Sequence, residues 1–275
     1  MRNLMILAGN ELRDGLRNRW VAATILLLAA LAFSLALLGS APTGNVQATP
    51  MDITVAGLAS LTVYLLPLIA LMLAFDAIVG EVERGTLLLL LAYPVARWQV
   101  IVGKFLGHGL ILMAALLVGY GGAGVALQFT GGADAESWRA YLLLMATSWL
   151  LGVAFVAIGY LVSVLVRERA TAAGVAVGVW LLFVVLYDLG LLGLLLADTG
   201  QRLSADVVAA LLLANPTDIF RVLNLTGSET VSLLAGMAEA GRTTGFGPTL
   251  LIGLLAGWSV VPLGLAAAVF QRRAL

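Results

Sequence analysis

Six runs of this sequence are apolar over about the length that a helix needs to cross a lipid bilayer. They cover residues 20–39, 57–79, 105–127, 141–166, 172–196 and 248–270. About 20 helical residues span the roughly 30 Å of bilayer hydrocarbon, where backbone groups must be hydrogen-bonded within the segment. Hydrophobic residues make up 61% of the chain and charged residues 11%, against about 25% charged in soluble domains. We therefore predict an all-α integral membrane protein, a single domain over residues 1–275 with six transmembrane helices in contact with lipid.

The basic residues are divided unevenly among the segments that flank these runs. Eleven of the 15 lie in the N-terminal segment, in the connections after the second and fourth runs, and in the C-terminal tail. They are Arg2, Arg13, Arg17, Arg19, Arg84, Arg97, Lys104, Arg167, Arg169, Arg272 and Arg273. Cytoplasmic connections carry an excess of Lys and Arg. We therefore predict that both termini are cytoplasmic, in a bacterial inner membrane.

Residues 1–19 alternate apolar and polar side chains with the period of a helix. Met5, Ala8, Leu12 and Leu16 fall on one face. The opposite face carries Asn10, Arg13, Asp14, Arg17 and Asn18. A helix that is apolar on one side and basic on the other is typical of an interfacial helix lying on the membrane surface.

The connection over 80–104 contains more structure than a plain connector needs. It holds a polar patch, a glycine, a run of five leucines and a Tyr-Pro turn. Connections between elements are usually only a few residues long. We predict a short helix at the cytoplasmic face, on which a soluble partner can push.

The predicted outer loop over 197–247 is also long and patterned. Ser204 with Asp206, Asn215 with Pro216, and Ser228 with Glu229 each resemble the start of a short amphipathic helix. Two interpretations remain open for these three helices. They form a docking platform for a periplasmic partner, or they seal the outer mouth of the membrane helices.

Residues suited to chemistry are few. There is no Cys and a single His, and no Walker A phosphate loop or nucleophile elbow is present, so we predict neither an enzyme nor a metal site nor catalytic residues. The zero net charge gives no indication of nucleic-acid binding. Asp76, His108 and Asp188 are polar residues in or near apolar runs, which suggests a functional role by default; for His108, satisfaction by water or a neighbour is the simpler interpretation.

Three methionines and two glycine pairs have alternative interpretations. Met72, Met113 and Met145 are soft potential copper ligands, but they are scattered, which favours core packing. Gly103 with Gly107, and Gly174 with Gly178, have the spacing that allows two helices to approach closely.

The loop motif resembles that of the type-two ABC transporter permeases. The pattern is Glu-x-Glu-x-Gly-Thr-Leu from Glu81, then Tyr-Pro-Val-x-Arg from Tyr93, then Gly103-Lys104. The resemblance implies a coupling helix that docks on a cytoplasmic ATPase subunit, with ATP and Mg bound by that partner, and a second copy of this chain. The implied coupling residues are Glu81, Glu83, Arg84, Gly85, Thr86, Tyr93, Pro94 and Arg97.

Within that family, residues 9–20, 81–104 and 215–221 resemble the membrane subunits of transporters that mature nitrous oxide reductase. This implies a role in denitrification, with a periplasmic copper-maturation protein as a partner. The residues expected to dock that partner are Asn215, Pro216, Asp218, Phe220 and Arg221. Whether copper, a sulfur compound, another solute or only a conformational signal crosses the membrane stays open.

Other functions are compatible with the same sequence. The chain could be the permease of an ABC exporter for another small molecule, a plain membrane anchor, or a stand-alone proton-coupled carrier. The carrier would use Asp76, His108 and Asp188, and it would need no ATPase. A docking helix in the loop over 80–104 separates the permease from the carrier and the anchor, because neither of these needs one.

Overall fold

The computed structural model describes residues 2–39, 49–130, 135–197, 205–225 and 246–273, and over these ranges every regular element is a helix. The elements in chain order are α1 (Arg2–Leu16), α2 (Arg19–Gly39), α3 (Pro50–Ala74), α4 (Val79–Glu83), α5 (Thr86–Leu91), α6 (Arg97–Leu116), the π-helical turn η1 (Leu117–Gly121), α7 (Gly122–Thr130), α8 (Ala135–Leu165), α9 (Arg169–Leu181), the π-helical turn η2 (Leu182–Leu186), α10 (Tyr187–Ala197), α11 (Ala205–Leu213), α12 (Pro216–Leu225) and α15 (Pro248–Arg272).

Five continuous helical stretches in the described ranges are long and apolar enough to cross a membrane. They are Pro50–Glu83, Arg97–Phe129, Ala135–Leu165, Arg169–Ala197 and Pro248–Arg272. Two further pairs qualify only together, α1 with α2 at a bend of 70° and α11 with α12 at a bend of 104°. The membrane protein class is therefore confirmed with five spans, or up to seven if each bent pair counts as one. The number six stays a prediction.

The helix predicted for the second apolar run begins earlier than that run indicates, at Pro50, because Thr49 caps the start of α3. The Thr49 side chain accepts a hydrogen bond from the Asp52 amide at 3.2 Å, and the Asp52 carboxylate accepts from the Thr49 amide at 3.0 Å. This reciprocal pair is a capping box, and Pro50 suits the first helical position. Ser137 also donates to Asp52 at 3.0 Å, which fixes the start of α3 against α8.

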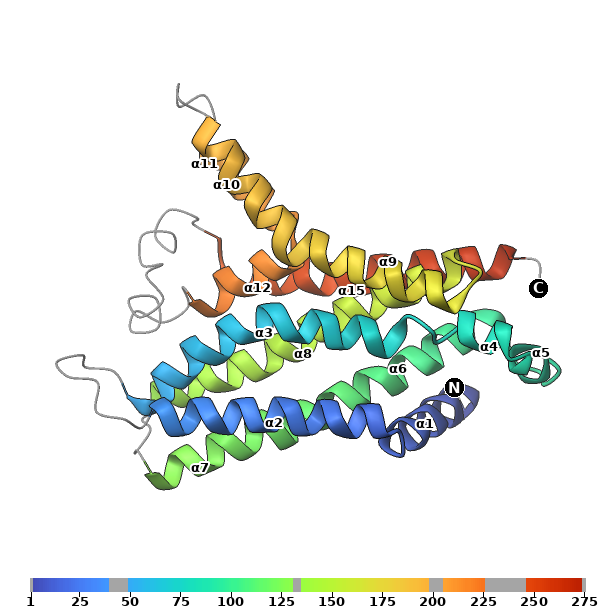
Figure 1. The fold of residues 1–275 in the computed structure, drawn as a ribbon, viewed down its shortest axis with the longest axis horizontal. Helices are drawn as coiled ribbons and strands as arrows, with labels where there is room; N and C mark the ends of the chain where they lie inside the picture. Colours follow the sequence, from blue (N-terminus) through green and yellow to red (C-terminus); the bar gives the residue numbers. More distant parts are fainter. Residues whose placement is uncertain (1, 40–48, 131–134, 198–204, 226–245, 274–275) are drawn as a thin grey trace.

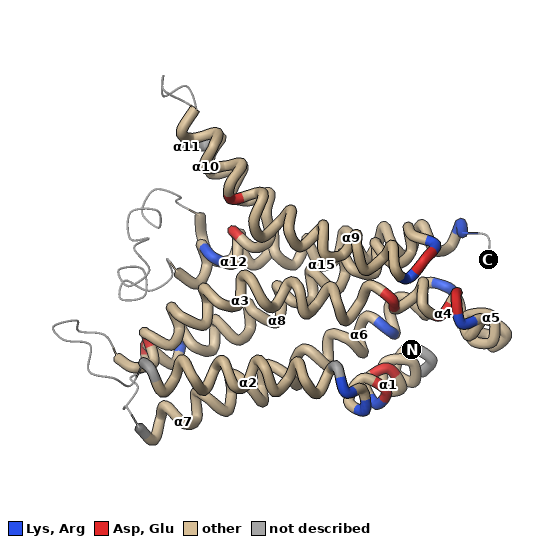
Figure 2. The backbone as a smooth tube through the Cα atoms, viewed as in Figure 1, with Lys and Arg blue, Asp and Glu red and all other residues tan. Residues whose placement is uncertain are grey.

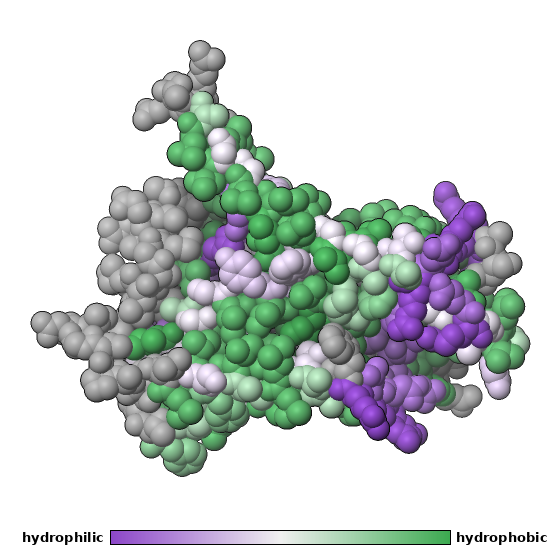
Figure 3. Space-filling view, in the orientation of Figure 1, coloured by the Kyte–Doolittle hydropathy of each residue, from purple (hydrophilic) through white to green (hydrophobic). Residues whose placement is uncertain are grey.

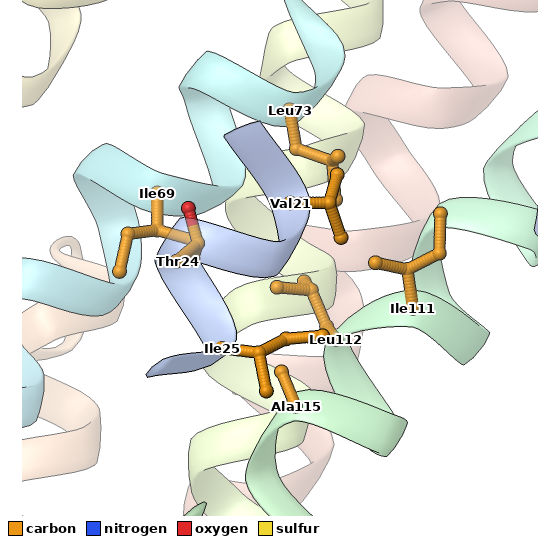
Figure 4. A pocket seen from close by; sticks show the side chains of 8 residues that line it. All are labelled: Val21, Thr24, Ile25, Ile69, Leu73, Ile111, Leu112 and Ala115. Carbon is orange, nitrogen blue, oxygen red and sulfur yellow. The ribbon is translucent and has the colours of Figure 1, made fainter. Parts of the chain in front are cut away.

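The long helices run side by side, with α8 in the interior (Figure 1). α8 packs most extensively against α3 and α15, and its Tyr141, Phe155 and Tyr160 are fully buried. The α9–η2–α10 stretch contributes little to this core, and α10 leads away from the bundle (Figure 1). A small cavity of about 10 Å³ lies between α2, α3 and α6 (Figure 4). Thr24 is the one polar residue among the eight that line it, so the cavity is a packing gap with little to bind a polar ligand.

Charged residues gather at one end of the bundle, around α1, α4, α5 and the C-terminal end of α15 (Figure 2). Figure 3 shows the same region as a hydrophilic zone beside the hydrophobic flank of the helices. We call it the charged end. The structure thus brings together the N-terminal segment, the loop over 80–104 and the C-terminal segment, which the basic-residue pattern assigned to one side of the membrane.

Candidate functional site

The loop over 80–104 is built from two short helices, α4 and α5, joined at Gly85. Gly85 has φ of 72°, a left-handed conformation that favours glycine. In α5 the Leu87 side chain is buried, whereas Leu88 and Leu89 are 63% and 69% exposed, and Tyr93 is 69% exposed. The three exposed side chains Leu88, Leu89 and Tyr93 form an apolar surface at the charged end, which we call the α5 tip. Figure 3 shows hydrophobic atoms at this extremity, beyond the hydrophilic zone.

The base of the loop is anchored to α8 and α9. The Ile78 and Val79 amides donate to the buried Ser163 side chain of α8 at 3.0 and 3.1 Å. Asp76 pairs with Arg169 at 2.9 Å, and the Arg169 amide donates to Glu83 at 2.6 Å. Asp76 is therefore engaged in an ion pair at the charged end. A movement of α4 cannot leave α8 and α9 unaffected while these contacts persist.

The end of the loop is attached to the last helix of the chain. Arg97 donates to the backbone carbonyls of Phe270, at 3.2 Å, and of Arg273, at 2.6 Å. Arg273 in turn donates to the carbonyls of Val164 and Val166 at the end of α8, at 2.7 and 3.0 Å. Burial, together with the positive charge of Arg167, lowers the pKa of the Arg273 guanidinium from its ordinary value. Arginines suit this position because their several donors satisfy carbonyls left free at helix ends.

A buried group of ionisable side chains lies behind the loop. Lys104 of α6 forms ion pairs with Glu11 of α1 and with Glu81 of α4, the latter at 3.1 Å. Glu11 also contacts His108 Nε2 at 3.1 Å. The His108 Nδ1 atom lies 2.8 Å from the Tyr160 hydroxyl of α8. We call these five residues the buried charge cluster. These contacts agree with the simpler interpretation of His108, in which neighbouring side chains satisfy it. Its two ring nitrogens face Glu11 and Tyr160.

The close approach of α1 to α6 depends on the first glycine pair. A Cβ atom at Gly103 would lie 2.7 Å from Leu7 Cβ, and one at Gly107 would lie 2.5 Å from Glu11 Cβ. The face of α1 that is turned to α6 includes Ala8 and Glu11, whereas Met5 and Leu16 are 74% and 52% exposed. The predicted apolar face of α1 is therefore divided, because Ala8 packs on protein and the exposed pair is free to meet lipid. At the second pair, Gly174 and Gly178, an added Cβ would meet no other element within 4 Å in the part of the chain that the structure describes.

The segment 215–221 lies in the interior, where the sequence suggested an exposed docking surface. The side chains of Asn215, Pro216, Asp218 and Phe220 are buried, and Asp218 is 1% exposed. Asp218, which the sequence predicts as a residue that docks the periplasmic partner, is therefore not exposed on the surface of this chain. The amphipathic pattern of α12 is real, but its polar face is turned toward partners inside the protein.

Those partners are on α8, η2 and α10. Asn224 and Thr147 form a hydrogen-bonded pair at 2.9 Å. Asn215 and Thr217 both donate to the backbone carbonyl of Phe183, at 2.9 and 3.2 Å. A π-helical turn shifts the regular hydrogen-bond ladder of a helix, and here η2 presents the Phe183 carbonyl to side chains of another element.

Arg221 joins two carboxylates at the outer border of this region. It contacts Asp218 at 2.6 Å and Asp188 at 2.9 Å. The Arg221 side chain is 22% exposed, that of Asp218 is 1% exposed and that of Asp188 is 32% exposed. Asp188 is therefore paired, and the three intramembrane polar residues singled out in the sequence belong to three separate groups of contacts.

Other predicted features lie elsewhere. Met72 and Met145 pack against the hydrophobic core. The third predicted outer helix, which starts at Ser228, lies outside the described residues. Sequence reasoning missed Glu11, Ser163 and Arg273. Of these three, only Glu11 could have been found from the sequence. It lies three residues from Ala8 and four from Leu7, so it shares their helix face.

Comparisons of the sequence with known proteins show its family. A sequence model of the family described as ABC-2 family transporter protein matches residues 5–275. A protein of Stutzerimonas stutzeri named "probable ABC transporter permease protein NosY" is 46% identical over 275 residues, which cover 99% of each chain. A protein of the same name from Pseudomonas aeruginosa is 45% identical over 273 residues, which cover 97% of each chain. This chain therefore belongs to the ABC-2 family of transporter proteins, as a membrane permease subunit.

Proposed function

We propose that this chain couples a cytoplasmic ATPase to a periplasmic partner during copper-site assembly of nitrous oxide reductase. The ATPase part of the proposal rests on one observation. The exposed α5 tip is continuous with a loop that is attached to α6, α8, α9 and α15 by named polar contacts. A push on the α5 tip therefore reaches several long helices at once.

The ATPase supplies the nucleotide chemistry in this proposal. Since the chain has no Walker A loop, ATP and Mg are bound by the partner. The α5 tip inserts Leu88, Leu89 and Tyr93 into an apolar cleft of that subunit, while Glu83 and Arg84, both exposed, add polar contacts. The charged end faces the cytoplasm, and two copies of the chain form the membrane unit.

The copper-assembly part is supported by resemblance. The two relatives carry the name NosY at 46% and 45% identity over almost the whole chain, and residues 9–20, 81–104 and 215–221 carry the narrower likeness. The periplasmic partner contacts the end of the bundle opposite the charged end. Asn215, Pro216, Asp218 and Phe220 are buried, so they act by holding α12 in place and do not touch the partner directly.

The spans transmit a conformational signal and do not conduct copper in this proposal. A selective copper path needs soft or imidazole ligands clustered within bonding reach. His108 is held by Glu11 and Tyr160, and Met72 and Met145 contribute to the core. Replacing Met72, Met113 and Met145 together by Leu should leave copper-site assembly within about twofold, because Leu and Met have similar volumes. If a folded, ATPase-bound triple variant loses copper-site assembly, copper conduction through the spans is favoured over transmission of a conformational signal.

Co-purification tests the ATPase role. The variant Leu88→Asp with Leu89→Asp places two charges in the proposed apolar contact. Loss of interface anchors costs about 2 kcal/mol or more, roughly 30-fold in affinity, so the ATPase should be lost from the purified complex. Because both side chains are exposed, the chain should still fold and insert. Arg17→Glu, on the exposed face of α1, is the control and should retain the ATPase. Retention of the ATPase by the double variant would move the docking site elsewhere.

The alternative functions differ in what they require. A proton-coupled carrier would need Asp76, His108 and Asp188 to communicate, but each is satisfied by partners of its own. An ABC exporter of another small molecule uses the same coupling loop, so it shares the ATPase contact. Copper-loaded nitrous oxide reductase, measured in cells that lack this chain, distinguishes the exporter from the assembly role.

A further inference from the structure

The buried charge cluster joins four helices that are distant in the sequence. Glu11 is on α1, Glu81 on α4, Lys104 and His108 on α6, and Tyr160 on α8. The side chains of Lys104 and His108 are 9% and 6% exposed, and those of both glutamates are 19% exposed. Charges removed from water to this extent are costly unless they are paired. The pairing is therefore a strong constraint on the relative positions of α1, α4 and α6.

The pairing is asymmetric between the two carboxylates. Glu11 is held by Lys104 and by His108, and His108 is itself in contact with Tyr160. Glu81 has Lys104 as its one ion-pair partner within the described residues, and its Oε2 atom is buried there without a hydrogen-bond partner. Glu81 is thus the more loosely held member. A displacement of α4 would change the Glu81–Lys104 contact first.

The geometry of α4 makes such a displacement possible. Its start is fixed to α8 by the amides of Ile78, just before α4, and Val79, its first residue, which donate to Ser163. Glu81 lies farther along α4, toward the α5 tip. A push on the tip would rotate α4 about the Ser163 contact and shift Glu81 relative to Lys104.

On the other side of Lys104, α1 and α6 are packed without space between them. Gly107 lies so close to α1 that a Cβ there would come 3.0 Å from the Ala8 carbonyl oxygen. Tightly packed helices shift as units between discrete arrangements. A change in the position of Lys104 is therefore passed to α1 through Glu11.

We infer that Lys104 is a positioning residue that links the coupling helix α4 to the interfacial helix α1, so that ATP-driven movement of the loop also moves α1. The inference rests on the proposed ATPase contact. Movement of the loop would then reach α1 at the membrane surface, in addition to α8, α9 and α15.

Reporter cysteines test this link in the assembled complex, because the chain has no native Cys. An environment-sensitive fluorophore is attached at Asp14→Cys on α1 or at Ala92→Cys just after α5, both exposed positions. Mg-ATP is added to each complex in lipid nanodiscs. Both reporters should respond in the parent chain.

Glu81→Gln and Lys104→Met each break the link between α4 and α1. The α1 response to ATP should fall about tenfold in both, within the usual range of coupling energies between sites, whereas the response at Ala92→Cys should persist. Lys104→Arg keeps the charge and should retain most of the α1 response. A purely structural role for Lys104 would reduce both responses together. Glu81→Gln keeps the side-chain volume, so it serves as the second variant if Lys104→Met does not fold.

Thr62→Val is the matched control. It removes another buried hydrogen bond between helices, the 2.8 Å contact of Thr62 with Tyr120, and it should leave both responses unchanged. An α1 response that is unaffected by Glu81→Gln and Lys104→Met overturns the inference and leaves the ATPase contact intact. A parent chain whose Ala92→Cys reporter does not respond to ATP overturns the proposed function and this inference with it.

Discussion

At the residue scale, the same residue type has different roles according to its depth. Asp188 and Asp218 both pair with Arg221, but Asp188 is 32% exposed and Asp218 is 1% exposed. Asp218 also accepts a hydrogen bond from Asn215 at 3.0 Å. An exposed ion pair contributes little, whereas a buried polar group left without its partner carries a desolvation penalty.

Alanine at the two aspartates should therefore have unequal effects. Asp218→Ala should lower the free energy of unfolding by about 1–3 kcal/mol, since Asn215 and Arg221 both lose an acceptor in a buried setting. Asp188→Ala should lower it by about 0.2–1 kcal/mol. Thermal unfolding of the detergent-solubilised variants measures both. Equal effects would show that the depth of the two carboxylates does not control their contribution.

The two glycine pairs provide a second comparison at this scale. Gly107→Leu should displace α1 from α6, because even a Cβ there would meet Glu11 at 2.5 Å, and overpacking typically costs about 1–3 kcal/mol. Gly178→Leu should be tolerated within about 0.5 kcal/mol of the parent, because in the described residues a Cβ added at Gly178 would have no atom of a neighbouring element within 4 Å. Protease sensitivity of α1 and thermal unfolding would report the difference. A larger effect at Gly178 would mean that its open face packs on another molecule.

At the element scale, α4 and α5 depend on one backbone conformation to turn the α5 tip outward. Because Gly85 has φ of 72°, Gly85→Ala should cost about 1–2 kcal/mol and weaken ATPase retention. Gly9→Ala lies at an exposed helical position, where an added Cβ would meet no other described element within 4 Å. It should instead stabilise α1 by about 0.5–1 kcal/mol. Differential scanning fluorimetry distinguishes the expected loss of stability in Gly85→Ala from the expected gain in Gly9→Ala. Unchanged ATPase binding by Gly85→Ala would show that the α4–α5 turn adapts without loss.

The α12 element shows why a short amphipathic helix is hard to interpret alone. Its polar face is satisfied by Phe183, Asp188 and Thr147, which belong to η2, α10 and α8. With α11 it forms the 104° bent pair. Of the two interpretations of residues 215–221, this placement favours the one in which they close one end of the bundle. It does not favour a direct docking surface.

At the scale of the whole molecule, we expect the end where the charged residues gather to face the cytoplasm. Cys at Ala92, on the charged end, should be protected from an impermeant thiol reagent in intact cells. Cys at Glu136, exposed at the start of α8 on the opposite end, should react. Permeabilised cells, in which both should react, provide the control. The opposite labelling pattern would place the α5 tip outside and exclude a cytoplasmic ATPase there.

The sequence by itself determined the membrane class, five of the six predicted helical spans, the structured loop over 80–104 and the family likeness. Hydropathy and motif spacing are properties of neighbouring residues, so they can be read without the fold. The close-packing role of Gly103 and Gly107 was also within reach, because a four-residue spacing places both on one helix face.

Only the tertiary structure decided which polar side chains meet. Lys104 and Glu11 are 93 residues apart, and Arg97 contacts a carbonyl 176 residues away. No local pattern specifies such pairs, since they form where separate helices pack and where each buried charge must find a partner. The same reason explains α12: its amphipathic pattern predicted a polar face, but whether water or protein covers that face is decided by the neighbouring helices.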